Sequence, residues 1–129
     1  MQQHINYPIA LFVLIFSSLA NAQITWNTGA TITANVTDED IILNGVIHVA
    51  DGLTIHSMNQ DINITLMSSS QIRNNPGANA TLHVIADSGR TITFIQNDGQ
   101  SMIWRAEGNA FTFTISEEGA GTIIKSSQS

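Results

Sequence analysis

Residues 83–94 read HVIADSGRTITF and contain the two features that decide the fold. An apolar strand end runs into Asp87-Ser88-Gly89, after which Thr91-Ile92-Thr93-Phe94 alternates polar and apolar side chains. Strict alternation is typical of a β-strand with one buried face, and Asp, Ser and Gly are typical of tight turns. The stretch therefore predicts two short strands joined by a corner.

The same pattern recurs along the chain. Residues 30–34 (ATITA), 53–56 (LTIH), 62–66 (INITL) and 111–115 (FTFTI) alternate in the same way, and no stretch after Gln23 shows sustained helical spacing of apolar residues. Turn signals separate the runs: Asn27-Thr28-Gly29, Asn44-Gly45, Asp51-Gly52, Asn74-Asn75-Pro76-Gly77, Asn97-Asp98-Gly99 and Glu107-Gly108-Asn109. The sequence therefore predicts an all-β protein.

Composition limits the size and the class of the protein. The 129 residues carry 10 acidic and 4 basic side chains, a formal net charge of −6, and no cysteine. This length predicts a single domain. An acidic balance argues against nucleic acid and against an anionic membrane surface as partners. The absence of cysteine excludes disulfides, thiolate zinc sites and a cysteine nucleophile.

The N-terminal segment has the pattern of a signal peptide. Residues 9–19 (IALFVLIFSSL) form an apolar run that is too short for a good membrane span, and Ala20-Asn21-Ala22 follows with small residues in an A-x-A arrangement. We therefore predict a signal peptide over residues 1–22, cleavage after Ala22 and a domain over residues 23–129. An uncleaved anchor or a buried helix is the alternative, because residues 1–7 contain no Lys or Arg.

Three segments indicate a repeat. HVADGLTI (residues 48–55), HVIADSGRTI (83–92) and WRAEGNAFTF (104–113) each place an alanine, an acid and a glycine between two strand-like runs. The spacing of Gly29, Gly52, Gly89 and Gly108 favours a β-solenoid of about five coils of roughly 20–23 residues, whose inward aliphatic side chains are buried only when coils stack. An antiparallel β-sandwich of seven short strands is the alternative fold.

With these motifs, the Cys-free chain resembles the start of a right-handed parallel β-helix passenger of autotransporters and filamentous haemagglutinin-type adhesins. The resemblance implies an exported, non-enzymatic module at the cell surface, the outer membrane or outside the cell, which contacts a host surface, matrix or glycan. Asn75-Pro76-Gly77 only partly matches the NPNG-type motif, and no translocator barrel is present. Residues 122–129 resemble a strand that opens another coil, which indicates a domain truncated at its C-terminus within a larger protein.

A fragment of a carbohydrate-active, pectate-lyase-like β-helix is the alternative function. Such enzymes use carboxylates with Arg or Lys along one groove, and the candidates here are Asp51, Asp87, Glu107, Arg73, Arg90 and Arg105. The three acids lie at corners, where they are explained as turn formers. The chain has no G-x-S-x-G motif and no P-loop. We therefore expect no enzyme, no catalytic residue and no cofactor.

Metal sites are not expected either. His48 and His83 hold equivalent places in two repeats and are predicted to stack, but a zinc site would need further ligands in register, and His56 is the one other histidine after Gln23. Asp38-Glu39-Asp40 is the densest acidic cluster, yet it has no EF-hand spacing. We interpret the histidines as outward strand residues and the acids as a solvated turn.

Three further patterns are weaker. Thr31/Thr33, Thr91/Thr93 and Thr112/Thr114 form T-x-T pairs that could order water on an ice-binding solenoid, but the intervening coils lack them. Trp26, Trp104 and Phe111 could stack on sugars, although capping or core packing is the better interpretation. Asn35, Asn63 and Asn79 are glycosylation sequons that matter only in a eukaryotic secretory pathway.

Overall fold

The computed structural model describes residues 21–67, 69–96, 103–106 and 110–125, and these residues form strands and turns with no helix. The strands are β1 (Ala22–Asn27), β2 (Thr31–Ile32), β3 (Val36–Thr37), β4 (Glu39–Asn44), β5 (Val46–Val49), β6 (Thr54–Ser57), β7 (Ile62–Leu66), β8 (Gln71–Asn74), β9 (Ala80–Ala86), β10 (Thr91–Gln96), β11 (Ile103–Arg105), β12 (Phe113–Glu118) and β13 (Thr122–Ile124). The described part of the chain contains no helix with the length and hydrophobicity needed to span a membrane.

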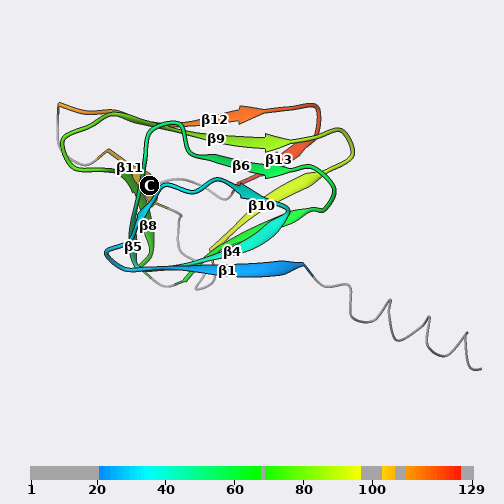
Figure 1. Cartoon of the computed structure of the whole chain (residues 1–129), viewed down its shortest axis with the longest axis horizontal. Coiled ribbons are helices and arrows are strands. Elements are labelled where there is room, and N and C mark those ends of the chain that lie inside the picture. The colour runs from blue at the N-terminus through cyan, green and yellow to red at the C-terminus, as the bar shows by residue number, and fades with distance from the viewer. Residues whose placement is uncertain (1–20, 68, 97–102, 107–109, 126–129) are drawn as a thin grey trace, which may run out of the picture.

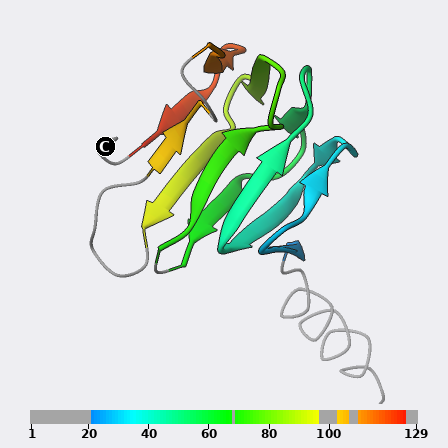
Figure 2. The same cartoon turned by 90° about the vertical axis from the view of Figure 1, so that its left-hand side faces the viewer.

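The strands form three parallel sheets around a common interior (Figure 1). Sheet A has the order β1-β4-β7-β10-β13, sheet B the order β2-β5-β8-β11, and sheet C the order β3-β6-β9-β12. Each strand pairs with the strand three places later in the chain, and in Figure 2 the colour changes steadily from strand to strand across the molecule. All the described pairings are parallel. The antiparallel sandwich is therefore wrong for these strands, and the all-β class is confirmed.

Three successive strands, one from each sheet, make up what we call a circuit. The described strands give four circuits, which are β1–β3, β4–β6, β7–β9 and β10–β12, followed by β13. The predicted length of roughly 20–23 residues per coil is wrong for most circuits: Ala22 pairs with Glu39, 17 residues further on, whereas Ile62 pairs with Ile92, 30 residues further on. The circuits lengthen both at the corners and in the strands, since β2 and β3 have two residues each whereas β8 has four and β9 has seven.

Alternation along the strands builds the interior. In β7, Ile62, Ile64 and Leu66 are fully buried while Asn63 and Thr65 face outward, as the sequence predicts. Register then stacks apolar residues of successive circuits, for example Ile41 on Ile64. One cluster of aliphatic side chains, with Trp26 and Phe94, fills the space between the three sheets. A parallel arrangement of this kind buries each side chain between the circuits above and below it.

The predicted turn residues lie at corners, but they do not mark one kind of corner. Gly29 lies between sheets A and B, Gly52 between B and C, and Gly89 between C and A, each with a positive φ. The repeats aligned on these glycines are therefore not structurally equivalent. Corners between each pair of sheets use a glycine with left-handed backbone, so the glycine signal indicates that a corner exists without saying which one it is.

Gly45 shows the closest constraint at a corner. Its φ is 117°, and a Cβ placed there would lie 1.6 Å from Thr28 Oγ1 of the preceding circuit. Its backbone N–H donates to Ser70 Oγ of the next circuit at 2.9 Å. Glycine is therefore needed here both for its backbone conformation and for the close approach of neighbouring circuits.

Asn and Asp side chains extend the backbone pairing between circuits. In each case the side-chain Oδ1 accepts a backbone N–H from the following circuit, at 2.8–3.0 Å. The acceptor and donor residues are Asn35 with Thr54, Asp40 with Asn63, Asp51 with Thr81, Asp61 with Thr91, and Asn79 with Thr112. These residues satisfy donors at places where the strand ladder begins or ends.

Asp38 holds an entire corner of the next circuit. Its carboxylate accepts the backbone N–H groups of Met58, Asn59 and Gln60, the shortest at 2.7 Å, and its own φ is 55°. Desolvation raises the pKa of Asp38, but the three backbone hydrogen bonds together outweigh it and leave the pKa below its ordinary value of 3.8. The carboxylate is therefore a structural acceptor, and not simply part of a solvated acidic turn.

The parallel register can be tested because the chain has no cysteine of its own. Asn63 and Thr93 are in register on neighbouring strands, so their Cα atoms lie about 4.8 Å apart, within the range of a disulfide. We expect the double variant N63C/T93C to oxidise to a monomeric, faster-migrating species on a non-reducing gel and to gain in Tm.

The matched control is T25C/I95C, whose positions lie on β1 and β10 with two strands between them, roughly 14 Å apart. This pair should not form an intramolecular bridge. Efficient bridging in the control, or none in N63C/T93C, would contradict the register.

The second prediction concerns Asp38. Asp38→Ala removes the acceptor of three N–H groups and places alanine at positive φ, so we expect a loss of about 1–3 kcal/mol in the free energy of unfolding. Asp38→Asn keeps one acceptor oxygen, and asparagine tolerates the positive φ, so this variant should lose less stability.

Because the folded-state pKa of Asp38 is lowered, the stabilisation by its carboxylate is present above pH 3.8 and is lost as the pH falls through the folded-state pKa. Urea unfolding of the two variants between pH 2.5 and about 7 should show a weaker acid dependence than the wild type, and equal stability of Asp38→Ala and wild type would refute this role.

Candidate functional site

The outer face of sheet C carries histidines, carboxylates and hydroxyls in register. One row runs from Thr54 through His83 to Ser116, and the neighbouring row from His56 through Ile85 to Glu118. These residues face outward because they alternate with buried residues such as Ile55 and Val84. Strands β6, β9 and β12 thus bring together side chains that lie up to about 60 residues apart in the chain.

Two histidine–carboxylate pairs connect successive circuits on this face. His56 Nε2 lies 2.8 Å from Asp87 Oδ1, and His83 Nδ1 lies 2.5 Å from Glu118 Oε2. Ser116 Oγ donates to the same Glu118 oxygen at 2.8 Å. The side chains of His83 and Glu118 are 37% and 39% exposed, so a ligand from solution can reach this pair.

The electrostatics of the pair favour an ionised carboxylate. The hydrogen bond from His83 is the main cause that lowers the pKa of Glu118, followed by the bond from Ser116 and the charge of His83, while desolvation opposes them. Glu118 therefore stays ionised below its ordinary titration range. His83 keeps Nε2 for a further contact, because Nδ1 is the nitrogen that faces Glu118.

This arrangement can bind polar ligands but lacks the geometry of a nucleophilic site. Ser116 donates to the Glu118 carboxylate and not to a histidine, and because the pKa of Glu118 is lowered, this carboxylate is a weak base. The pairs lie on the outer face of sheet C, and they do not line the hollow around Trp26. In the described part of the chain, no three His, Asp or Glu side chains are placed to hold a metal ion.

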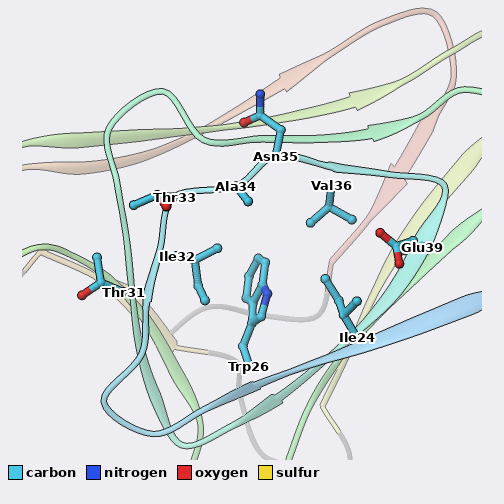
Figure 3. A pocket seen from close by; sticks show the side chains of 9 residues that line it. All are labelled: Ile24, Trp26, Thr31, Ile32, Thr33, Ala34, Asn35, Val36 and Glu39. Carbon is cyan, nitrogen blue, oxygen red and sulfur yellow. The ribbon is translucent and has the colours of Figure 1, made fainter.

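A hollow lies elsewhere, at the first circuit (Figure 3). It has a volume of about 370 Å³, and Ile24, Ile32 and Val36 surround the indole of Trp26. The remaining lining residues are Thr31, Thr33, Ala34, Asn35 and Glu39. Glu39 is thus the one ionisable residue among those that line it, which leaves the hollow without a pair of groups for acid–base chemistry.

The candidate catalytic residues do not converge on one groove. Asp51 accepts a backbone N–H at the corner before sheet C, and Asp87 pairs with His56. Arg90 lies 3.8 Å from Asp61 at a corner between sheets C and A, and Arg73 bonds Gln71 on sheet B. Arg105 is in backbone register with Arg73; its side chain and Glu107 lie outside the described residues.

The predicted stacking of His48 on His83 is wrong. His48 lies on β5 in sheet B, in register with Thr31 and Arg73, whereas His83 lies on β9 in sheet C. The error follows from aligning the repeats by their Asp-Gly corners. His56 and His83 share a sheet instead, and each faces an acid rather than another histidine.

The threonine pairs also separate. Thr91 and Thr93 lie on β10 in sheet A, Thr31 on β2 in sheet B, and Thr114 on β12 in sheet C. They therefore form no stacked T-x-T array. The sequon residues Asn35 and Asn79 act as inter-circuit acceptors, and Asn63 is outward on sheet A.

Of the three aromatic residues singled out in the sequence, Trp26 is buried in the interior and Phe111 is half-buried. The side chain of Trp104 lies outside the described residues. A surface for stacking on sugars is therefore not assembled from Trp26, because its indole packs against aliphatic side chains.

Sequence reasoning missed both histidine–carboxylate pairs. His56 and Asp87 are separated by 31 residues, and His83 and Glu118 by 35, so no short motif joins them. The available signal was the alternation itself, which places His56 and His83 on outward positions. Finding their partners requires the unequal circuit lengths, which the sequence does not state.

Comparison with known proteins adds no relative: no family model, no curated protein and no solved structure matches the chain. Residues 1–20, which hold most of the predicted signal peptide, lie outside the described residues. Ala22, after which we predict cleavage, is the first residue of β1 and pairs with Glu39. The predicted cleavage and export therefore remain predictions.

The pKa of Glu118 gives a test of the sheet C contacts. His83→Asn removes the main cause of the lowered pKa, so we expect the Glu118 carboxyl to titrate closer to 4.5, its ordinary value, in side-chain carboxyl NMR. His48→Asn, the same change on sheet B, should leave the titration unaltered. An unchanged titration in His83→Asn would show that this contact does not form in solution.

Proposed function

We propose that the protein is an exported, right-handed parallel β-helix that works as a non-enzymatic surface-binding module, with the outer face of sheet C as its ligand face. The three-sheet order with parallel pairing supports the β-helix, and parallel crossover connections are right-handed in about 98% of cases. The predicted signal peptide supports export. The resemblance to adhesin passengers supports a role at the cell surface and contact with a host surface, matrix or glycan.

One observation supports the outer face of sheet C as the ligand face: polar side chains of successive circuits lie side by side there and are partly exposed to solvent. His83 and Ser116 both contact Glu118, and the pair of His56 with Asp87 lies one circuit away. A rigid sheet fixes the spacing of these donors and acceptors before a ligand arrives, which lowers the ordering cost of binding. Hydroxyl-rich glycans match such a face because each of their groups both donates and accepts.

A carbohydrate-active β-helix is the second candidate. The histidine–carboxylate pairs favour it, because they place an acid and a base within hydrogen-bond reach on one face. Against it stands the dispersal of the arginines, with Arg73 on sheet B and Arg90 at a corner. Each member of the acid–base pairs is also engaged by its partner rather than aimed at an empty site.

The two candidates differ in what happens to a glycan. The chain is expressed with its own N-terminus, recovered after export and sequenced; we expect it to begin at Gln23. Its binding to immobilised glycans and matrix proteins, and the release of shorter or unsaturated sugars, are then measured together. We expect saturable binding without products, weakened about tenfold or more in His83→Asn and Glu118→Gln.

His48→Asn is the matched control and should bind as the wild type does. Release of products that is lost in His83→Asn would establish the enzymatic alternative. Binding that is equal in all variants, or absent for every glycan and matrix protein, would refute sheet C as the ligand face. A protein retained in the cytoplasm would refute export.

A further inference from the structure

The corner between β4 and β5 has the composition that favours spontaneous deamidation. Asn44-Gly45 is the single Asn-Gly pair in the 129 residues. In this reaction the backbone nitrogen of the following residue attacks the asparagine side chain, and glycine has no side chain to obstruct the approach. Asn44 is the last residue of β4 and is exposed, so water reaches it. The groups that the reaction needs are therefore present at this corner.

The neighbouring circuits hold the backbone of this corner on both sides. The Gly45 N–H donates to Ser70 Oγ at 2.9 Å, and this hydroxyl donates in turn to the carbonyl of Leu43 at 2.9 Å. Ser70 is buried. From the preceding circuit, Thr28 donates its N–H at 3.0 Å and its hydroxyl at 2.9 Å to the carbonyl of Asn44. In the folded protein, the nitrogen that would attack is therefore engaged.

We propose that Asn44-Gly45 is a protected deamidation site, at which the hydrogen bond to Ser70 sets the rate of the reaction. When the corner opens, the Gly45 nitrogen loses its proton to solvent and attacks Cγ of Asn44. The new C–N bond closes a succinimide ring, while the side-chain amide takes up a proton and leaves as ammonia. Water then opens the ring at either carbonyl, which gives aspartate or isoaspartate. The reaction needs no enzyme and no reagent besides water.

The isoaspartate product does not fit the closed corner. It routes the main chain through the former side chain and so adds one methylene group between β4 and β5. The corner is closely packed, since even a Cβ on Gly45 would lie 1.6 Å from Thr28 Oγ1. Asn44 is also in register with Asn27 on β1. We therefore expect isoaspartate to lower the Tm, so that each opening that leads to reaction removes a molecule irreversibly from the native state.

The first test compares the folded and the unfolded wild-type chain. The protein is kept in buffer and in guanidinium chloride at the same pH and temperature, and mass spectrometry of peptides separates reaction at Asn44 from reaction at Asp51-Gly52. We expect Asn44 to react about a hundredfold or more slowly in the folded chain. The ratio of the two rates should agree, within about tenfold, with the open fraction given by hydrogen exchange of the Gly45 N–H.

The second test changes the acceptor. Ser70→Ala removes the partner of the Gly45 N–H, so we expect Asn44 in the folded chain to react about tenfold faster or more. Ser57→Ala is the matched control, because Ser57 is also buried and its hydroxyl also donates to a backbone carbonyl, that of Gln60, but on sheet C. This variant should leave the rate at Asn44 unaltered.

The Tm of both variants is measured, so that opening of the corner is distinguished from a general loss of stability. Equal rates in the folded and unfolded wild type, or a rate in Ser70→Ala no faster than in Ser57→Ala, would overturn the proposal. If Ser70→Ala does not fold, the comparison with hydrogen exchange decides, and a disagreement beyond about a hundredfold is contrary to the proposal. Ligand binding through sheet C is measured separately, and its failure leaves this result unaffected.

Discussion

The structure depends on parallel backbone pairing between successive circuits. No circuit has an interior of its own, because three short strands cannot enclose their inward side chains. Ile64 is fully buried only because Ile41 lies on one side of it and Phe94 on the other. The corners turn the chain from one sheet to the next, and the side-chain acceptors bind backbone N–H groups at strand ends, so that the pairing continues from one circuit to the next.

Side-chain acceptors explain how the pairing survives unequal circuits. Where paired strands begin at different points, backbone N–H groups near their ends have no strand partner. Asn35, Asp51 and Asn79 each place an oxygen where such a donor emerges from the next circuit. Asp38 does this for three successive N–H groups. The acidic character of the chain is therefore partly structural, because several carboxylates serve the backbone.

The outer face of sheet C and the hollow of the first circuit differ in chemistry. Sheet C gathers histidines, carboxylates and a serine on an open surface, which suits recognition of a polar ligand better than bond cleavage. The hollow of the first circuit, in contrast, is lined mainly by apolar side chains around Trp26. The proposed ligand face therefore lies apart from this hollow.

The sequence by itself determined the all-β class, the alternation of Ile62–Leu66 and the turns, because these follow from local periodicity and from the few residues that adopt positive φ. The tertiary structure decided the length of each circuit, and therefore which residue each one pairs with across a sheet. A residue added to a corner or a strand changes little in the local pattern, yet it changes how far apart in the sequence two paired residues lie. For that reason the sequence paired His48 with His83, whereas the fold brings His83 to Glu118 and His56 to Asp87.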